Sequence, residues 1–261
     1  MCTFILAWRV FADEPVVVAA NRDEHLDRAS RPPAVVDDDP RVVAPLDEEA
    51  GGTWLGYNEH GVLVSVTNRW TDADLAGERS RGLLVREALA RESAAAAAAY
   101  VTEQTRSVEY AGFNLVVADA DLAALLAWDG ELTRREFAPG VHVVVNVGAD
   151  DTFEVPTFRN VPGEVRAELG AAAERQVTSA RRARAELAAR SGESADEWVD
   201  RAVGVLRDHE YGFCVHREEF GTRSSSVVRL PTGGDPVFEY ADGPPCDPAV
   251  TFDRVAVPDP S

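Results

Sequence analysis

Apolar residues in the first quarter of the chain form short runs or alternate with polar residues, and both patterns predict β-strands. The strands expected there cover residues 3–10, 15–20, 53–57 and 62–67. The last two predict a hairpin around residues 58–61, with Gly61 as the residue that adopts a positive φ. The segment 25–50 is rich in Asp and Pro, so we expect a loop there that is long enough to cover a functional site.

The middle of the chain predicts a helix followed by a series of strands. Residues 82–100 have the pattern of a helix, which includes the alanine run 94–99. Successive strands are then expected at residues 113–118, 123–128, 132–137 and 141–147. Pro139-Gly140 is a turn dipeptide, and it places a reversal directly before the last of them.

The last part of the chain carries clear helix boundaries. Pro162 begins a long helix that is expected to run to about Arg190 and to stop at Gly192, since proline favours helix starts and glycine helix ends. The tetrapeptide 194–197 matches a capping box for a further helix through Leu206. Strands are then expected at residues 212–216, 225–230, 237–240 and 250–257.

The order of these elements is strands, a helix, strands, two helices and strands. Because strands and helices are grouped rather than alternating, a doubly wound parallel sheet is disfavoured. The grouping favours an α+β fold with two mainly antiparallel sheets and helices packed on their outer faces. We expect a single domain over residues 1–261, a length that one α/β domain commonly has.

The net charge of the chain indicates which partners and which solvent conditions suit the protein. The 261 residues include 45 acidic and 26 basic residues, for a formal net charge of −19, and every basic residue is an arginine. Such a surface argues against nucleic acid or an anionic membrane as a partner. It fits a halophilic cytosol, because at ~1 M salt the Debye length is only about 3 Å and carboxylates repel one another little. A GC-rich genome also explains the missing lysine, but it does not by itself produce this net charge.

Several classes of protein and site are not expected. The chain has no apolar run of the roughly 18 residues that span a membrane. Its first residues lack the basic region and long apolar stretch of a signal peptide, so we expect a cytoplasmic protein. The three cysteines are odd in number and far apart, which is not a disulfide framework. Cys214 and His216 make only half of a zinc site, and we expect neither a metal nor another cofactor.

Cys2 is the first candidate for chemistry, because a small second residue allows Met1 to be removed. An N-terminal cysteine carries a thiol with a pKa near ~8.5 and an amine with a pKa near ~8, so proton transfer between them costs little. A terminal threonine and its amine form such a pair in other enzymes. Taken alone, a cysteine at position 2 is also compatible with no catalytic role.

Polar residues follow the second predicted strand directly. If the strand continues through them, Asn21 and Asp23 share one face and Arg22 lies on the other. Asp23 would then lie beside the terminal ammonium and fix its orientation and charge. An Asx turn or a helix cap explains Asn and Asp at this place equally well.

Three further polar residues stand next to predicted strands. Asn68 ends the second strand of the hairpin, and Asn146 follows an apolar run in the same way. A side-chain amide at either place could donate to an oxyanion, which typically lowers a barrier by ~3 kcal/mol. Arg223 could bind a carboxylate or phosphate through two hydrogen bonds. Turn-forming asparagines, and a surface arginine paired with one of the 45 carboxylates, are the structural alternatives.

Seven short motifs together resemble the NRDE family, which is also called the transport and Golgi organization type. They are Met1-Cys2-Thr3-Phe4, Asn21-Arg22-Asp23-Glu24, Gly51-Gly52-Thr53-Trp54-Leu55-Gly56, Thr67-Asn68, Ser80-Arg81-Gly82, Gly112-Phe113-Asn114-Leu115 and Gly221-Thr222-Arg223. They occur in that family's order and cover most of the chain. The resemblance implies a four-layer αββα sandwich of the N-terminal nucleophile hydrolase type, in agreement with the grouping of the elements.

A more distant resemblance is to the choloylglycine hydrolase and penicillin V acylase group, whose members begin Met-Cys-Thr and carry Arg-Asn-x-Asp at the end of an early strand. Asn21 and Asp23 match that pattern, but Ala20 stands in the place of its arginine. The catalytic residues implied by the resemblance are Cys2, Asp23, Asn68 and Asn146. The substrate-binding candidates are Asn21, Arg22, Trp54 and Arg223.

Two functions of different classes follow from these resemblances. The first is an N-terminal cysteine amidohydrolase that cleaves a linear, non-peptide C–N amide bond in a small substrate with a lipid-like or aromatic acyl group. The alternative is a non-catalytic protein that binds and carries lipid, acyl-CoA or haem on the same fold. In the second case the pocket next to Cys2 holds its ligand without turnover.

Overall fold

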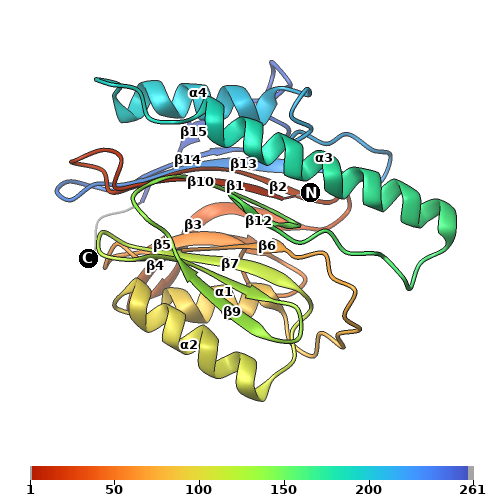
Figure 1. Cartoon of the computed structure of the whole chain (residues 1–261). Helices are drawn as coiled ribbons and strands as arrows, with labels where there is room; N and C mark the ends of the chain where they lie inside the picture. Colours follow the sequence, from red (N-terminus) through yellow and green to blue (C-terminus); the bar gives the residue numbers. More distant parts are fainter. Residues whose placement is uncertain (1, 258–261) are drawn as a thin grey trace.

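The computed structural model describes residues 2–257. In this part of the chain two β-sheets lie face to face, and helices cover the outer face of each sheet (Figure 1). Helices α3 (Gly163–Glu186) and α4 (Ala195–Arg207) lie on one side, and α1 (Arg81–Leu89) and α2 (Ala94–Ser107) lie on the other. The expected α+β fold, a four-layer αββα sandwich, is confirmed.

The first sheet carries the start of the chain in its centre. Within the described range it has eight strands in the order β12-β11-β10-β1-β2-β13-β14-β15. Their bounds are β1 (Thr3–Trp8), β2 (Val16–His25), β10 (Gly140–Val145), β11 (Gly148–Ala149), β12 (Thr152–Phe153), β13 (Phe220–Leu230), β14 (Val237–Ala241) and β15 (Asp253–Arg254). Because β1 pairs antiparallel with both β10 and β2, the backbone that follows Cys2 is held by hydrogen bonds on both sides.

The second sheet is built almost entirely from strands that are neighbours in sequence. Over residues 2–257 its order is β3-β4-β5-β6-β7-β8-β9, and all its pairings are antiparallel. The bounds are β3 (Ser30–Asp38), β4 (Arg41–Asp47), β5 (Leu55–Asn58), β6 (Leu63–Asn68), β7 (Phe113–Ala118), β8 (Ala123–Trp128) and β9 (Leu132–Glu136). The hairpin expected around Gly61 is formed by β5 and β6, and Gly61 has a φ of 76°.

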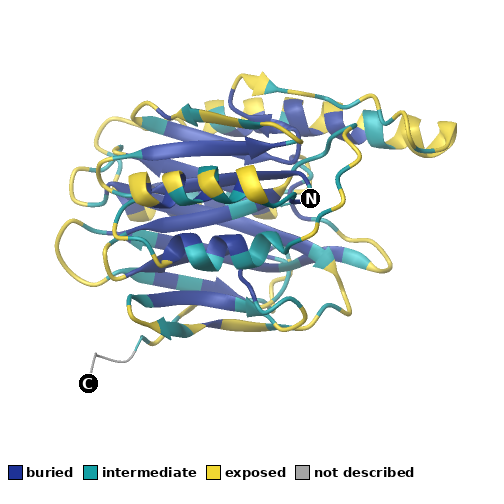
Figure 2. Ribbon diagram, turned by 90° about the horizontal axis from the view of Figure 1, so that it is seen from below, coloured by how far each residue is buried: buried dark blue, intermediate teal, exposed yellow. Residues whose placement is uncertain are grey.

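Alternation along β1 and β2 separates two of the hydrophobic cores. Phe4 and Val18 pack between the two sheets, whereas Ile5 and Ala19 pack toward α3 and α4. Burial of a large apolar side chain is typically worth about 1.5–3 kcal/mol, so this alternation fixes the register of both strands. Figure 2 shows the result as buried strands in dark blue beneath helices whose outer faces are yellow. The same alternation decides which polar residues at the strand ends face the interior of the sandwich.

The helices on the first sheet begin as the sequence predicts. Pro162 is the N-cap residue of α3. Before α4, the side chain of Ser194 accepts a hydrogen bond from the backbone of Glu197, and the Glu197 side chain accepts from the backbone of Ser194, which completes a capping box. On the other sheet, the single helix expected at residues 82–100 is wrong, because α1 and α2 are separate helices. Ser93 caps α2 by accepting a hydrogen bond from Ala96.

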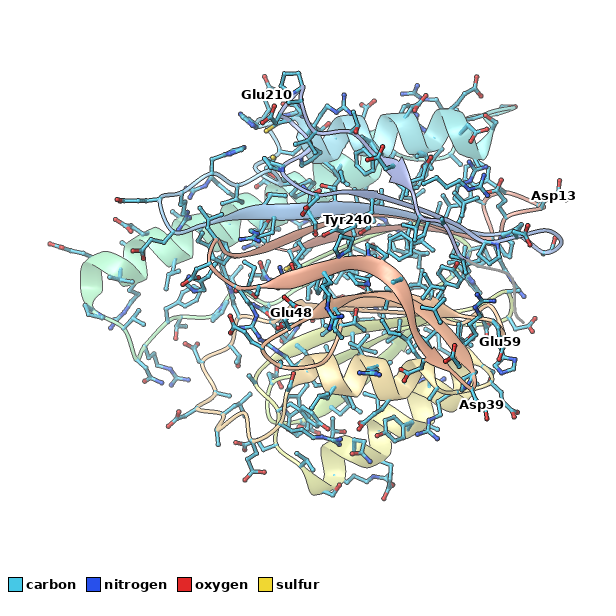
Figure 3. The ribbon with its side chains drawn as sticks, turned by 180° about the vertical axis from the view of Figure 1, so that it is seen from behind. Asp13, Asp39, Glu48, Glu59, Glu210 and Tyr240 are labelled. Atoms are coloured by element: carbon cyan, nitrogen blue, oxygen red, sulfur yellow. The ribbon has the colours of Figure 1, made fainter. Side chains whose placement is uncertain are left out.

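The loop expected at residues 25–50 is also wrong, because most of this segment forms the hairpin of β3 and β4. Pro32 and Pro33 do not prevent it: β3 is the edge strand of the second sheet, and its pairing is irregular between Arg31 and Ala34. Figure 3 shows this hairpin crossing one side of the molecule, with Asp39 at its turn and Glu48 beyond its opposite end.

The strand expected at residues 212–216 is reduced to one isolated bridge between His216 and Gly221. Here Val215 donates its backbone N–H to the Thr222 hydroxyl, and Thr222 donates its own N–H to the carbonyl of Val215. The strand expected at 250–257 is short as well, since β15 contains only Asp253 and Arg254. β2, in contrast, runs further than expected and includes Asn21 to His25. None of the helices among the described residues is long and apolar enough to cross a membrane.

Candidate functional site

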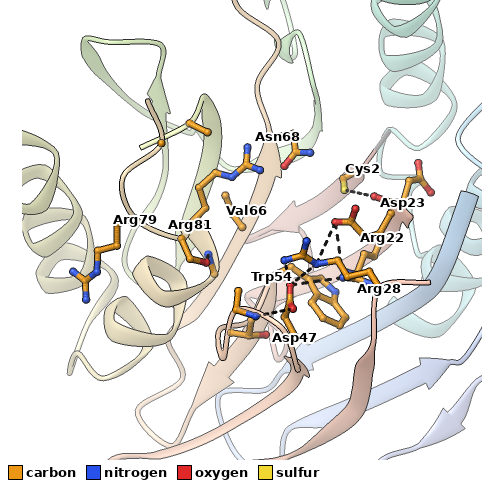
Figure 4. A pocket seen from close by; sticks show the side chains of 17 residues that line it. Cys2, Arg22, Asp23, Arg28, Asp47, Trp54, Val66, Asn68, Arg79 and Arg81 are labelled. Carbon is orange, nitrogen blue, oxygen red and sulfur yellow. Dashed lines mark hydrogen bonds and ion pairs between the residues drawn. The ribbon is translucent and has the colours of Figure 1, made fainter. Parts of the chain in front are cut away.

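A cavity of about 300 Å³ opens beside Cys2, where the ends of β1, β2 and β6 meet the start of α1 (Figure 4). Of the residues predicted to form the site, the cavity is lined by Cys2, Arg22, Asp23, Trp54 and Asn68. These residues come from four separate segments of the chain, so only the folded sandwich brings them together. The size of the cavity is at the lower end of the range for small-molecule sites.

Cys2 is half-buried at the entrance of β1, with its sulfur directed at the cavity. Thr3 pairs with Asn21, and the alternation along β1 and β2 therefore puts Cys2 on the same face as Arg22. The Sγ atom donates to the backbone carbonyl of Asp23 over 3.6 Å. Burial raises the pKa of the Cys2 thiol, and the nearby Asp23 carboxylate adds to this effect. The expected removal of Met1 concerns a residue that lies outside the described range.

Asp23 is only 2% exposed and is oriented by a neighbouring strand. The Thr222 hydroxyl on β13 donates to its Oδ1 over 2.5 Å. Burial raises the pKa of the Asp23 carboxyl, while the hydrogen bond from Thr222 acts in the opposite direction. Asp23 therefore combines an unfavourable location for a negative charge with a donor that stabilises this charge.

Two asparagines meet at the end of β6, but only one of them lines the cavity. Asn68 is exposed there, and its side-chain amide forms no hydrogen bond within residues 2–257. Asn146 is 1% exposed, and its Nδ2 donates to the backbone carbonyl of Asn68 over 2.7 Å. Asn146 thus holds the end of β6 in place, while the Asn68 amide is available to a ligand.

Arg22 forms one wall of the cavity together with Trp54. Its guanidinium lies over the Trp54 ring, 4.1 Å from the ring centroid, and is 3.9–4.0 Å from the carboxylates of Glu24 and Asp47. Burial lowers the pKa of Arg22. Asp47 is bound more closely by Arg28, at 2.8 Å. The stacked ring and the distant carboxylates fix the plane of the Arg22 guanidinium beside the sulfur.

Arg81 lies at the start of α1 and also lines the cavity. Its Nη1 donates to the carbonyl of Gly112, burial lowers its pKa, and it forms no ion pair within the described range. A close backbone contact sets its position: Thr53 donates to the carbonyl of Gly82 over 3.0 Å. A Cβ on Gly52 would lie 2.2 Å from the carbonyl carbon of Gly82, so only glycine fits. The Gly-Gly-Thr and Ser-Arg-Gly motifs therefore form one wall together.

Two predicted binding residues do not line this cavity. Asn21 lies on the helix-facing side of β2, where its Nδ2 donates to the carbonyls of Leu206 and Phe213. It also accepts a hydrogen bond from Ser225, so it attaches the end of α4 to the sheet. The guanidinium of Arg223 donates to the carbonyl of Leu26 at the surface. Both side chains bind neighbouring segments of the chain and do not contribute to the cavity next to Cys2.

Arg81, Glu24 and Asp47 also line the cavity, although the sequence pattern did not indicate a role for them. The signal for Arg81 was present in its motif, because an arginine between a capping serine and a glycine begins a helix. Asp47 carried no such signal, since it lies in the segment that was expected to be a loop.

Side chains that could hold a metal gather outside this cavity. Cys214 and His216, which by sequence make only half of a zinc site, lie together with His209 and Cys246. The spacing along the chain could not indicate this group, because Cys246 belongs to a segment after β14.

Solved structures with a similar fold extend over nearly the whole chain. Penicillin V acylase from Agrobacterium tumefaciens matches with a TM-score of 0.56 and 15% identity, covering 97% of this chain and 84% of that one. The Caenorhabditis elegans ortholog of N-acylethanolamine-hydrolyzing acid amidase matches with a TM-score of 0.56 and 14% identity, covering 90% and 94%. The C2A mutant of conjugated bile acid hydrolase from Clostridium perfringens has a TM-score of 0.51 and 9% identity, covering 98% and 92%. The chain therefore shares the fold of these three structures.

Sequence comparison identifies the family. The bovine (Bos taurus) Transport and Golgi organization protein 2 homolog is 28% identical over 241 residues, which covers 85% of this chain and 84% of the relative. The mouse (Mus musculus) homolog is 30% identical over 140 residues, or half of each chain. The model of the family matches residues 1–238. The chain belongs to the family described as Transport and Golgi organisation 2, as the NRDE resemblance implied.

Proposed function

We propose that the protein is an amidohydrolase that uses Cys2 as an N-terminal nucleophile and cleaves a linear amide bond of a small N-acyl substrate. The observation that carries this proposal is the position of the Cys2 sulfur, which faces a cavity shared with Asp23 and with the unengaged amide of Asn68. The structural neighbours support the choice of reaction, because their names are those of an acylase, an amidase and a hydrolase.

In the proposed reaction, the Cys2 sulfur attacks the amide carbonyl and its proton passes to the α-amine that removal of Met1 exposes. The amine then delivers this proton to the leaving nitrogen, and water hydrolyses the resulting thioester to regenerate the thiol. Asp23 orients the amine and stabilises its positive charge from a buried position. The hydrogen bond from Thr222 keeps the carboxylate of Asp23 in place during these steps.

Asn68 serves as the oxyanion donor in this scheme. Its amide reaches the cavity without another partner, so it can donate to the oxygen on which negative charge develops. Asn146 acts as a positioning residue, since its own amide is engaged with the backbone of Asn68. This role differs from the direct oxyanion contact expected for Asn146.

The charges around the cavity favour a substrate with an anionic group. Arg81 has no carboxylate partner within residues 2–257, and Arg22 lies nearly 4 Å from its two. A carboxylate on the substrate could accept hydrogen bonds from both guanidinium groups. Trp54 offers the adjacent apolar surface for an acyl or aromatic group.

The experiment combines intact-mass analysis with a panel of N-acyl compounds. We expect the purified chain to lack Met1 and to cleave members of the panel, and we expect Cys2→Ser to lower turnover by orders of magnitude with an unchanged circular dichroism spectrum. Iodoacetamide should label Cys2 faster than the buried Cys214. Retention of Met1 would exclude the amine mechanism. Absence of cleavage together with slow labelling of Cys2 would exclude the nucleophile.

One observation favours a carrier on the same fold instead. Burial raises the pKa of the Cys2 thiol, and a thiol that stays protonated is a poor nucleophile. The arginines around the cavity would also suit the phosphates of acyl-CoA or the carboxylates of haem. Titration with acyl-CoA and with hemin, followed by calorimetry and visible absorbance, separates the two functions. Tight binding that survives Cys2→Ala, without cleavage, would favour the carrier.

A further inference from the structure

His209, Cys214, His216 and Cys246 form a compact cluster outside the cavity, and their potential ligand atoms all lie within 4.8 Å of one another. Three of these residues come from the segment between α4 and β13, and Cys246 comes from the segment after β14. No Asp or Glu of the described residues belongs to the cluster, although the chain has 45 of them. Two sulfurs and two imidazoles are therefore the complete donor set.

The distances inside the cluster are close to, and in part slightly shorter than, those between ligands of one tetrahedral ion. Bond lengths of about 2.3 Å to sulfur and about 2.0–2.1 Å to nitrogen place tetrahedral ligand atoms about 3.3–3.8 Å apart. The two sulfurs are 3.3 Å apart, and Nε2 of His216 lies 3.4 Å from the sulfur of Cys214 and 3.0 Å from that of Cys246. The His209 ring lies across that of His216, with centroids 5.3 Å apart.

We propose that these four side chains bind one zinc ion in a Cys₂His₂ site that none of the relatives' names indicates. Thiolate and imidazole ligands in tetrahedral geometry select zinc, whereas magnesium and calcium prefer oxygen ligands. On binding, both thiols lose their protons to solvent, and two thiolates with two neutral imidazoles compensate the charge of the ion. Because four protein ligands leave no open position, the ion has a structural role.

Local backbone geometry brings the ligands together. Gly212, with a φ of 67°, reverses the chain between His209 and Cys214. The bridge between His216 and Gly221 then fixes the segment against the start of β13. On the other side, a turn closed by the bond from Asp247 to the carbonyl of Pro244 presents Cys246. The zinc ion would join these two segments, which lie 32 residues apart along the chain.

The site also has a physical connection to Asp23. Val215 stands between two of the ligands, and its N–H donates to the Thr222 hydroxyl over 2.9 Å. That hydroxyl in turn donates to the Asp23 carboxylate. An ion held by Cys214 and His216 would therefore fix the residue that orients Thr222. This is a positioning effect, since the zinc ligands do not line the cavity next to Cys2.

Metal analysis of the full chain tests the proposal. After expression with zinc and gel filtration, mass spectrometry of metals should find about one zinc per chain. We expect the same content in Cys2→Ser and His60→Gln, which change a cysteine and an exposed histidine outside the cluster. Cys214→Ser and His216→Gln should contain less than a tenth of it. A chelator should remove the metal from the wild-type chain, and cobalt(II) added afterwards should give the visible absorption of a tetrahedral thiolate site. Because this measurement uses the wild-type chain, the test does not depend on variants that fail to fold.

Several results would overturn the site. One is a wild-type chain that binds neither zinc nor cobalt while its thiols are reduced. Another is a Cys214–Cys246 disulfide in the protein as isolated, detected as a single free thiol after denaturation. A third is a zinc content that Cys214→Ser and His216→Gln leave unchanged. Because the readout is metal content, the outcome is independent of whether Cys2 cleaves amides.

Discussion

The two regions that contain cysteine differ in what surrounds the sulfur. Cys2 lies alone at the start of a strand, beside a cavity lined by arginines and carboxylates. Cys214 and Cys246 contact each other and His216, and His209 lies within 4.8 Å of them. No Asp or Glu of the described residues belongs to this cluster. The first arrangement leaves room for a substrate, whereas the second fills the positions around one ion. Access and neighbouring groups, rather than the residue type, thus distinguish a candidate nucleophile from candidate ligands.

The two regions are also joined by one hydroxyl. Thr222 accepts a hydrogen bond from the backbone of the cluster and donates one to Asp23 in the cavity. Experiments that affect one region and spare the other can therefore measure how independent they are.

Removal of the metal should have the largest effect. An ion that binds only the folded state stabilises it by about 4 kcal/mol at a free concentration a thousandfold above its Kd. For a chain of this length, each kcal/mol shifts the melting temperature by about 2–4 °C. We expect a chelator to lower the melting temperature of the wild-type chain accordingly and to leave that of Cys214→Ser unchanged. Equal melting curves with and without chelator for the wild-type chain would contradict this.

Asn68→Ala tests the cavity alone. Loss of an oxyanion donor typically lowers turnover about 10²–10³-fold. Since Asn68 is exposed at the end of β6, the melting temperature and the zinc content should not change. Asn160→Ala removes an exposed asparagine elsewhere and is the matched control. Equal turnover in both variants would remove Asn68 from the mechanism.

Thr222→Val tests the link between the regions. The buried Asp23 carboxylate loses one donor, and a hydrogen bond to a charged group is typically worth about 1.5–3 kcal/mol of unfolding free energy. The hydrogen bond lowers the pKa of Asp23, so its loss should raise that pKa and move the acid limb of the pH–activity profile upward. Thr222→Ser should keep both properties, and a profile that is unchanged in the valine variant would argue against the link.

Asp23→Asn should separate stability from activity. Burial raises the pKa of Asp23 in the folded state, so between its ordinary and its raised value the folded chain holds a proton that the unfolded chain has lost. Wild-type stability therefore declines as the pH rises through this window. The asparagine variant lacks that decline, and at neutral pH we expect it to be inactive but more stable than the wild-type chain. Denaturant melts across the pH range measure this, and a constant difference at all pH values would contradict it.

Arg81→Met should have the smallest effect on activity, and this effect should be confined to KM. One charge-assisted hydrogen bond to a substrate carboxylate is worth about 1.5–3 kcal/mol, so KM for phenylacetylglycine should rise about tenfold or more. KM for the neutral phenylacetylglycinamide should change little. Arg106→Met is the control, because Arg106 is exposed, pairs with Glu103 and does not line the cavity. An equal change in KM for both compounds would mean that Arg81 does not bind the carboxylate of the substrate.

Hydrophobic pattern was sufficient for most of the framework. The bounds of β7 and β8 match the expected residues 113–118 and 123–128, because both strands are fully buried and are apolar except for Asn114. The faces of β2 were also predictable: Asn21 and Asp23 point to the helix-facing side, and Arg22 meets Trp54 on the other. A period of two is enough to assign these faces.

The remaining features depend on tertiary contacts. Pro32 and Pro33 made β3 resemble a loop, since an edge position that tolerates proline is not visible in the sequence. The different roles of Asn68 and Asn146 depend on a tertiary contact, in which the side-chain amide of Asn146 donates to the backbone carbonyl of Asn68. Cys246 joins the cluster only because β14 returns beside β13.

The contact between Gly52 and Gly82 has a consequence for how this cavity can change during evolution. The backbone around Gly52 contacts the backbone of Gly82 directly. The distance between the cavity wall that carries Trp54 and the wall that carries Arg81 is therefore fixed in the free protein. Relatives that adapt to new ligands can exchange the side chains that project from these walls, but they cannot widen the gap through the glycines. Libraries aimed at new selectivity should therefore vary Trp54 and Arg81 and keep both glycines.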